Sequence, residues 1–473
     1  MTTRDDGDRV LSKRLDRYPP VNICGRAQVR LSGWGRTAPG LSGLQRITSV
    51  AGAVAAVNGA PDRGLIPRGL GRAYGDAAQN SGGVVLDLTT LIGVGSVDPD
   101  TGIVEVMGGT SLALLLHHVL PRGWFVPVVP GTRQVTVGGA VAGDVHGKNH
   151  HVDGTFSRHV VSLDLLTADG VVRTIGPDQQ ADLFWDTAGG MGLTGVILSV
   201  RLRLLKVETG HVLVETSRIP DLDALMAAMS DDDSYRYSAA WIDCLARGRA
   251  TGRAVLLRGD HASVDQLPIK QRGSQAKDGS TALMAAPPWV PTGLLNRATV
   301  AAFNEAYFRR APRHHVGPQG LSSFFFPLDA LRGWNRLYGA GGLVQYQFAV
   351  PHGADEAVRA ALERLSSARV ASFLAVLKRF GAAGPGPLSF PLAGWTLAVD
   401  APARTAGLSS LFRSLDDVVM QAGGRVYLSK DSRLPASCLE VMYPRLKEWT
   451  AVRRSVDPGG HFVSDLARRL GLA

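Results

Sequence analysis

The chain has 473 residues, 45% of them hydrophobic and 19% charged, and this apolar content excludes wholesale disorder. The 51 lysines and arginines outnumber the 41 aspartates and glutamates, so the net charge of +10 favours acidic partners such as phosphate groups, anionic lipid or nucleic acid. The three cysteines are too widely spaced for a disulfide framework or a zinc site. The sequence contains no run of about 18 apolar residues, so it predicts no membrane span.

The first 205 residues predict one mixed α/β domain that is rich in glycine turns. Residues 1–24 are polar, and we expect them to form a flexible extension without the apolar segment of a signal peptide. A helix is predicted from residue 112, where apolar side chains recur at helical spacing, and it stops at Pro121. Strands are predicted at the apolar runs 84–88, 103–107, 160–166 and 196–205.

The segment 260–320 differs from the rest of the chain, and we expect it to form a mobile lid. Its residues 282–295 are largely apolar, but two successive prolines forbid a regular helix there. A basic run follows at 309–315. An exposed apolar loop beside basic residues suits a membrane surface, whereas a buried loop with a solvated basic edge explains the same pattern equally well.

Strands and helices return after residue 335. Alternation over 344–348 places two glutamines on one face of a strand and three apolar side chains on the other. Helical periodicity follows at 358–365 and at 408–419, and the second helix is expected to end at the glycine pair 423–424.

Four glycine-rich segments in the first half of the chain indicate sharp turns or close approach of the backbone to a ligand: 68–76, 130–140, 143–151 and 189–195. The first segment has neither the Lys-Ser/Thr pair of a Walker loop nor the spacing of a Rossmann fingerprint. Its backbone N–H groups could instead form an anion nest beside Arg68 and Arg72.

The third glycine-rich segment contains histidines at the spacing of a helical zinc pair. His146 and His150 stand four residues apart, but Gly147 occupies the position where a zinc protease needs its glutamate, and glycine disfavours the helix. A metal hydrolase that uses His146, His150 and His151 is therefore the weakest functional hypothesis, and we expect no metal.

The glycine-rich segments resemble the flavin domain of the vanillyl-alcohol oxidase class. They read Arg-Gly-Leu-Gly-Arg-Ala-Tyr-Gly-Asp, Pro-Gly-Thr-Arg-Gln-Val-Thr-Val-Gly-Gly-Ala and His-Gly-Lys-Asn-His-His. Within that class the chain resembles the decaprenylphosphoryl-β-D-ribose 2′-oxidase family, in order, from Gly33 to Leu470. The resemblance implies a two-domain α+β fold of the p-cresol methylhydroxylase (PCMH) type. Its FAD-binding domain would span 25–209, its antiparallel-sheet substrate domain 210–424, and a C-terminal return to the first domain 425–473.

The resemblance also implies a non-covalent FAD. Backbone donors of the first glycine-rich segment would cradle its pyrophosphate, and His146 would contact the flavin without the covalent bond that is frequent in the class. The implied FAD-binding residues are Arg68, Gly69, Leu70, Gly71, Arg72, Ala73, Tyr74, Gly75, Asp76, Gly131, Thr136, Val137, Gly138, Gly139, Gly143, Asp144, Val145, His146, Ile197 and Tyr427.

The implied reaction oxidises the 2′-hydroxyl of a decaprenylphosphoryl ribose: a base removes or relays the hydroxyl proton while a hydride passes to the flavin. The catalytic candidates are His146 and Lys430, which matches the family's active-site lysine. The Lys430 ammonium could stabilise charge on the reduced flavin, or, if burial lowers its pKa, the amine could accept the proton. A separate NADH-dependent keto-reductase is the implied partner, and it would complete epimerisation to the arabinose used in cell-wall arabinan.

The implied substrate-binding residues lie mostly in the second domain: Lys148, Trp241, Asn335, Arg336, Gln345, Gln347, Lys378, Thr396, Ala398 and Lys430. Of these, Lys148 and Lys378 would meet the lipid phosphate. Ala398 replaces a cysteine and Thr396 an asparagine of many family members, and strand alternation predicts that both face the pocket. Phe325 and its neighbour replace a Tyr-His pair. Without the thiol, covalent trapping by thiol-directed nitroaromatic inhibitors is expected to fail.

Two rival functions remain. A flavin oxidase of an alditol or aldonolactone shares the glycine-rich segments but needs no apolar surface to admit a lipid. The apolar residues 282–295 therefore distinguish this hypothesis from oxidation of a lipid-linked sugar. A non-catalytic binder of nucleic acid or membrane would explain the charge, but it leaves the glycine-rich segments without a purpose, and the basic residues are scattered. We therefore expect a polyprenyl-phosphate sugar substrate, peripheral membrane contact and no nucleic acid. Without a signal peptide, the chain is expected at the cytoplasmic face of the membrane, with the periplasm as the alternative.

Overall fold

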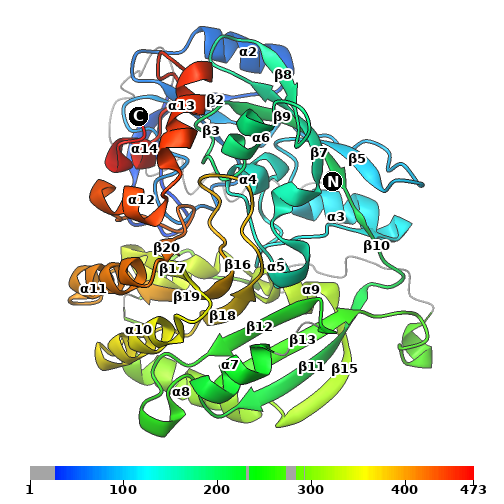
Figure 1. Cartoon of the computed structure of the whole chain (residues 1–473), viewed down its shortest axis with the longest axis vertical. Coiled ribbons are helices and arrows are strands. Elements are labelled where there is room, and N and C mark those ends of the chain that lie inside the picture. Colours follow the sequence, from blue (N-terminus) through cyan, green and yellow to red (C-terminus); the bar gives the residue numbers. More distant parts are fainter. Residues whose placement is uncertain (1–26, 231–233, 273–283, 292) are drawn as a thin grey trace.

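The computed structural model describes residues 27–230, 234–272, 284–291 and 293–473. The expected N-terminal extension thus lies outside the described residues. Two four-stranded sheets occupy one half of the molecule and an eight-stranded sheet the other (Figure 1). This mixture of helices and antiparallel sheet confirms the α+β prediction. Among the described residues, no helix has the length and apolar character needed to cross a membrane.

The first sheet has the order β1-β2-β4-β3 and a parallel centre. Its strands are β1 (Gln28–Leu31), β2 (Gly40–Arg46), β3 (Leu65–Arg68) and β4 (Val84–Asp87). Helix α2 (Val50–Asn58) packs Ala53, Ala56 and Val57 into the same core as Val84 and Leu86 of β4. Strand β3 runs directly into the first glycine-rich segment, which therefore starts at a fixed edge of the sheet.

The second sheet is antiparallel, in the order β5-β9-β7-β8. It consists of β5 (Ile103–Met107), β7 (Val160–Leu166), β8 (Val172–Ile175) and β9 (Val196–Arg203), and α3 (Leu112–Val119), α4 (Val137–Ala142), α5 (His150–Asp153) and α6 (Ala181–Thr187) lie around it. The predicted strands at 103–107 and 160–166 and the predicted helix from 112 are confirmed. Thr136 caps α4 by accepting a hydrogen bond from the Gly139 N–H, so the second glycine-rich segment ends in a helix start.

The third sheet is antiparallel in the order β15-β11-β13-β12-β18-β19-β17-β20. Its strands are β11 (His211–Ile219), β12 (Tyr237–Ile242), β13 (Ala254–His261), β15 (His314–Gly320), β17 (Leu343–Pro351), β18 (Ala375–Phe380), β19 (Gly394–Pro402) and β20 (Arg425–Val426). The remaining strands form two short pairs, β6 (Trp124–Phe125) with β10 (Leu205–Lys206) and β14 (Met284–Ala285) with β16 (Leu331–Arg332).

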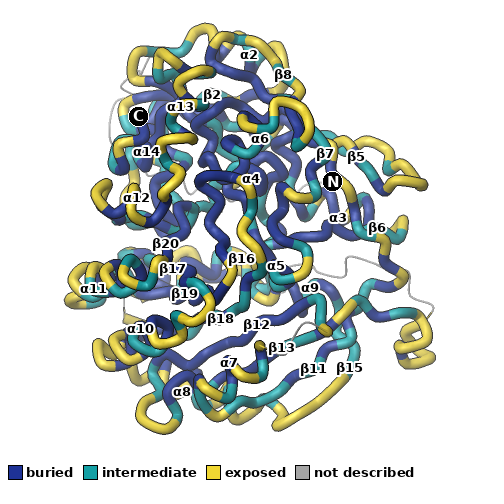
Figure 2. Tube along the Cα trace, viewed as in Figure 1, coloured by how far each residue is buried: buried dark blue, intermediate teal, exposed yellow. Residues whose placement is uncertain are grey.

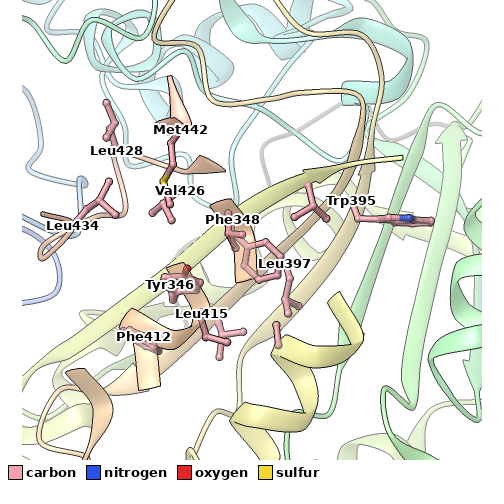
Figure 3. Packing of buried hydrophobic residues seen from close by; sticks show 14 of the residues in the cluster. Tyr346, Phe348, Trp395, Leu397, Phe412, Leu415, Val426, Leu428, Leu434 and Met442 are labelled. Atoms are coloured by element: carbon pink, nitrogen blue, oxygen red, sulfur yellow. The ribbon is translucent and has the colours of Figure 1, made fainter. Parts of the chain in front are cut away.

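The two faces of the third sheet differ because side chains alternate along each strand. Tyr346 and Phe348 of β17 pack with Phe412 and Leu415 of α11 (Leu408–Gln421) in one hydrophobic core (Figure 3). Helices α7 (Leu222–Ser230) and α10 (Asp355–Ser367) contribute to this core, and their outward sides are exposed (Figure 2). The predicted alternation over 344–348 is confirmed, so both glutamines of β17 face the other half of the molecule.

The end of the chain returns to the first half after β20 (Figure 1). Helices α12 (Ala436–Met442), α13 (Leu446–Val456) and α14 (Asp465–Leu470) follow, and Trp449 of α13 donates from its indole N–H to the Asp186 carbonyl at 3.0 Å. Arg469 of α14 forms ion pairs with Asp76 and Asp431 at 2.8 Å. This clamp fixes the residues around Lys430 against the first glycine-rich segment.

The expected lid segment, 260–320, does not form a single element in the structure. Residues 273–283 and 292 lie outside the described residues. Arg297–Arg310 form helix α8, capped by Asn296, and β15 is the edge strand of the third sheet, paired with β11. Helix α9 (Leu321–Phe325) follows. The pairing of β15 limits any lid to the residues that precede it.

Candidate active site

A cavity of about 350 Å³ lies between the first two sheets and the polar face of the third sheet. Residues of all four glycine-rich segments line it. Of the residues predicted to bind FAD, the cavity wall contains Arg68, Gly69, Leu70, Gly71, Arg72, Ala73, Tyr74, Gly131, Thr136, Gly138, Gly139, Gly143, Val145, His146, Ile197 and Tyr427. Of those predicted to bind substrate, it contains Lys148, Gln345, Gln347, Lys378, Ala398 and Lys430.

The glycines let the loops around the cavity pack without side chains between them. A Cβ atom on Gly69 would lie 2.2 Å from the Thr136 hydroxyl oxygen, and one on Gly75 would lie 2.0 Å from the Asp431 carbonyl oxygen. Gly131 is different, because a Cβ there would meet no protein atom within 4 Å. Gly69 and Gly75 therefore serve loop packing, whereas Gly131 leaves room on the cavity side.

The polar groups of the wall fit an extended cofactor that carries phosphates and a ring system. Within the described residues, the backbone N–H groups of 69–73 make no hydrogen bond to protein atoms, and Gly71 has φ +64°. Successive free N–H groups around a residue with positive φ form the kind of nest that binds anions. The Arg72 guanidinium stacks 3.9 Å from the centre of the Trp34 ring, and its buried Nε has no partner.

Four of the predicted FAD-binding residues support the wall from behind instead of lining it: Gly75, Asp76, Val137 and Asp144. The carboxylate of Asp76 accepts hydrogen bonds from Arg469 at 2.8 and 2.9 Å. Asp144 is buried and accepts from the Ser389 hydroxyl at 2.5 Å. Arg68 lines the cavity, but its guanidinium is occupied by the carbonyls of Ala78 and Ser32 at 2.7 Å. Its role is thus to hold the loop.

Three neighbouring strands of the third sheet supply the opposite wall. Ala398 of β19 lies between Gln347 of β17 and Val376 of β18 in the strand register, and all three line the cavity. Gln345 and Lys378 continue this wall on the same two outer strands. The register brings these side chains together from residues that are far apart in the sequence.

Trp241, Asn335, Arg336 and Thr396, which were predicted to bind substrate, do not line the cavity. The indole of Trp241 donates to the Phe373 carbonyl at 2.9 Å, and the Asn335 amide donates to the Trp34 carbonyl at 2.8 Å. Arg336 donates to the Ala286 carbonyl at 3.4 Å.

Thr396 lies on the predicted face of its strand, but the Gln347 amide covers it and donates a hydrogen bond to its hydroxyl at 3.3 Å. Of the two exchanges expected to face the pocket, only Ala398 does so. Phe325 lines the cavity, whereas Phe326 is buried in the hydrophobic core.

His146 is buried at the junction of the two walls. Its Nε2 lies 3.0 Å from the Gln347 amide nitrogen, and its ring packs edge-on against Phe380 at 4.8 Å. The pKa of His146 is well below 6.5, mainly because the ring is buried and, to a smaller extent, because of the nearby positive charge of Lys378. His146 is therefore neutral, with Nε2 accepting the hydrogen bond from Gln347.

The other histidines of this segment do not converge with His146 as metal ligands. The Gly381 N–H donates to Nδ1 of His150 at 3.2 Å, and His151 Nε2 lies 2.8 Å from the Tyr235 carbonyl oxygen. Among the residues that the structure describes, no cluster of His, Cys, Asp and Glu could hold a metal ion.

Three lysines place positive charge at the cavity. Burial lowers the pKa of Lys148 to about 7 and that of Lys378 to about 8. Lys148 donates to the Phe324 carbonyl at 2.6 Å, and the Lys430 ammonium lies 4.0 Å from the centre of the Tyr74 ring. In the described part of the chain, no carboxylate forms a salt bridge with any of these lysines. An anionic group of a ligand would compensate them.

The sequence interpretation gave no role to Asp400. This residue is completely buried on β19, directly opposite Gln345, whose amide donates to its Oδ1, and its Oδ2 has no partner. The signal was present, since alternation places Asp400 on the same face as Ala398. The aromatic residues Trp34 and Trp334, which also line the cavity, had no such signal.

Comparison with protein families is consistent with this geometry. Residues 43–176 match the FAD binding domain family, and residues 399–470 match the D-arabinono-1,4-lactone oxidase family. Among curated proteins, decaprenylphosphoryl-β-D-ribose oxidase of Mycolicibacterium smegmatis is 44% identical over 451 residues, which cover 94% of this chain and 97% of the relative. The L-gulono-1,4-lactone dehydrogenase of Mycobacterium tuberculosis is 24% identical and covers 91% of this chain and 96% of its own length.

Among solved structures, the BBE-like 1 protein of Physcomitrella patens superposes with a TM-score of 0.65 over 92% of both chains. Its sequence is 16% identical, so this similarity concerns the fold alone. It confirms the predicted PCMH-type fold.

Proposed function

The chain belongs to the decaprenylphosphoryl-β-D-ribose oxidase family, and we propose that it oxidises the 2′-hydroxyl of decaprenylphosphoryl-β-D-ribose to a ketone. It is an FAD-dependent oxidoreductase that acts on a CH–OH group. The observation that carries the proposal is the 44% identity over 94% of the chain, together with a cavity where the glycine-rich segments face three lysines.

The glycine-rich wall is the place for the cofactor. FAD, when bound, accepts the hydride that leaves C2′ of the sugar. The free N–H groups of 69–73 would bind its pyrophosphate, and Gly131 would give it room. We propose that the cofactor is not covalently attached and that His146 contacts it as a neutral imidazole held by Gln347.

The strand wall is the place for the substrate. We assign the lipid phosphate to Lys378 and Lys148, because both side chains line the cavity and neither forms a salt bridge with a carboxylate in the described part of the chain. Gln345 and Gln347 would orient the sugar hydroxyls, and Lys430 would lie at the reacting hydroxyl. The C2′–H bond would break as its hydride passes to the bound FAD, and the hydroxyl proton would pass to a base at the cavity as the ketone forms. The Lys430 amine is the candidate for this base, since burial lowers its pKa to about 8.

Anaerobic reduction of the flavin tests this function directly. Mixing the yellow protein with decaprenylphosphoryl ribose should bleach the flavin absorbance in a single turnover, and Lys430→Met should slow the bleaching by about 100-fold while retaining the flavin. Alditols and aldonolactones serve as the comparison, and aldonolactones are the second candidate because residues 399–470 match a lactone oxidase family. Faster bleaching by a lactone would overturn the assignment.

Acid precipitation tests the mode of FAD attachment. We expect the flavin in the supernatant, because the structure holds His146 Nε2 against Gln347. Flavin that stays in the pellet would show a covalent bond and would contradict the proposal.

We further propose a peripheral contact with the membrane, through apolar side chains near a basic groove. Met284, Trp289 and Leu294 are 69%, 74% and 46% exposed. A groove of about 310 Å³ is lined by Gly293 and Leu295, the chain neighbours of Leu294, and by the arginines Arg297, Arg369 and Arg404. Apolar residues beside a cationic surface suit anionic lipid headgroups.

Co-sedimentation with phosphatidylglycerol vesicles tests this contact. Binding should exceed that to phosphatidylcholine vesicles and should fall in Trp289→Ser and in Arg369→Ser. Equal sedimentation with both lipids would contradict it. We propose the cytoplasmic leaflet as the site, which a compartment-specific reporter fused to the C-terminus would test.

The ketone product calls for a second enzyme if the sugar is to be epimerised. We propose that an NADH-dependent keto-reductase returns a hydride to C2′ from the opposite face. A coupled assay should yield the arabinose epimer only when both proteins and NADH are present.

A further inference from the structure

A chain of buried hydrogen bonds connects strand β19 with His146 through Gln347. The Thr396 hydroxyl of β19 donates to the Phe348 carbonyl at 2.9 Å, and the Gln347 amide nitrogen lies 3.3 Å from the Thr396 hydroxyl oxygen. The same nitrogen lies 3.0 Å from Nε2 of His146. The side chains of Thr396, Gln347 and His146 are all buried, so they depend on one another for these hydrogen bonds.

The donors and acceptors of this chain can be assigned in only one way. A carbonyl oxygen only accepts, so the single hydroxyl hydrogen of Thr396 is used by Phe348. Thr396 must then accept its bond from Gln347, and only the nitrogen of the Gln347 amide can donate. The second hydrogen of this nitrogen is available to Nε2 of His146, which accepts it as a neutral ring.

We propose that Thr396 is a positioning residue, which fixes the Gln347 amide so that its oxygen faces the cavity as the acceptor for a hydroxyl of the sugar. Gln347 lines the cavity, and within the described residues its side-chain oxygen accepts no hydrogen bond. An amide turned the other way would place this oxygen against the Thr396 oxygen, which has no further hydrogen to donate. The inference rests on the proposed function, since that function supplies the sugar.

His146 does not select this arrangement by itself. A neutral imidazole carries its proton on either nitrogen, so Nε2 could accept from the amide nitrogen or donate to the amide oxygen. In the described part of the chain, Nδ1 of His146 has no hydrogen-bond partner that would favour one of these forms. Thr396 therefore decides between them, and it keeps the proton of His146 on Nδ1.

The tautomer of His146 reports the orientation of the Gln347 amide. Nitrogen NMR of the holoenzyme, isotopically labelled in its histidine side chains, distinguishes a protonated Nδ1 from a protonated Nε2, and His146→Gln identifies the signal by its absence. We expect the proton on Nδ1 in the unsubstituted protein and in Thr396→Ser, which keeps the hydroxyl. Thr396→Val has a similar shape without the acceptor, and it should show a second population with the proton on Nε2.

Two results of this measurement would overturn the proposal. One is a proton on Nε2 in the unsubstituted protein, which turns the amide nitrogen toward the cavity and needs no Thr396 variant to fold. The other is an unchanged tautomer in Thr396→Val, which would leave Thr396 a structural residue. Neither result depends on turnover, so a failure of decaprenylphosphoryl ribose to reduce the flavin would refute the proposed function while the tautomer still decides the role of Thr396.

Binding of fluorinated substrates tests the acceptor itself. Fluorine cannot donate a hydrogen bond, so in a series of derivatives that each replace one ribose hydroxyl by fluorine, one should bind about tenfold more weakly, as followed by the flavin absorbance. This loss should disappear in Thr396→Val and persist in Thr396→Ser. Losses of the same size in Thr396→Val and in the unsubstituted protein for every derivative would contradict the proposal.

Discussion

Ala398 is the residue that most changes the chemistry of the substrate wall. It lines the cavity between Gln347 and Val376, where many members of the family resembled have a thiol. A methyl group at this position offers no nucleophile and no hydrogen bond. Recognition of the sugar must therefore come from the glutamines and lysines around it.

The missing thiol leads to a prediction about covalent inhibitors. In a Cys24→Ser background, a thiol-directed nitroaromatic inhibitor should leave the protein mass unchanged, and Ala398→Cys should gain one inhibitor adduct by mass spectrometry. Cys244 and Cys438 are buried, and burial raises the pKa of each thiol, so they should not react. An adduct on the protein that retains Ala398 would show that another nucleophile reaches the cavity.

The shifted pKa of Lys378 gives a prediction about pH. Its pKa of about 8 means that the side chain is charged below this pH and neutral above it. The KM for the phosphate-linked sugar should therefore rise as pH increases through about 8. Lys378→Met should have a KM raised by about tenfold at neutral pH and a smaller rise of KM through pH 8 than the unmodified protein, with kcat changed less. A parallel rise of KM with pH in both proteins would contradict the assignment of the phosphate to Lys378.

At the scale of elements, the C-terminal helix α14 secures the strand-to-helix segment that carries Lys430. Arg469 connects Asp76 of the first glycine-rich segment with Asp431, the neighbour of Lys430. Asp431 is almost completely buried, so loss of its cation would leave an uncompensated charge.

Arg469→Met should accordingly lower the free energy of unfolding by about 3 kcal/mol, measured by urea denaturation. The matched control is Arg46→Met, which removes an exposed arginine 3.9 Å from Asp87 and should cost less than about 1 kcal/mol. Equal effects of the two substitutions would show that the clamp contributes no more than a surface ion pair.

At the scale of the whole molecule, the cavity is formed by chain segments from both halves. Residues of the first two sheets, of the third sheet and of the C-terminal return all line it. A ligand bound there contacts all of these parts at once and binds only the folded protein, so it should stabilise the molecule as a unit.

FAD should raise the free energy of unfolding by about 2.7 kcal/mol at a free concentration 100 times its Kd. Thermal unfolding of the deflavinated protein over a series of FAD concentrations measures this, and Tm should increase continuously with the logarithm of concentration. A Tm that does not respond to FAD would place the cofactor outside the folded cavity.

The sequence by itself determined the local features of this protein. Strand alternation put Gln345 and Gln347 on one face, helical spacing located α3 and α11, and the glycine-rich segments marked the loops of the cavity. These features depend on the period of side chains along one element and on the backbone freedom of glycine, which neighbouring residues specify.

Only the tertiary structure decided which of these residues meet. Trp241 and Thr396 do not line the cavity, because they form hydrogen bonds with the Phe373 carbonyl and with Gln347, and Asp400 lies opposite Gln345 on the neighbouring strand. The repeat of side chains along a strand or helix determines on which face of that element a residue lies. Its tertiary contacts depend instead on strand register and on the packing of segments hundreds of residues apart. The pairing of Gln345 with Asp400 depends on such register, so no local pattern could reveal it.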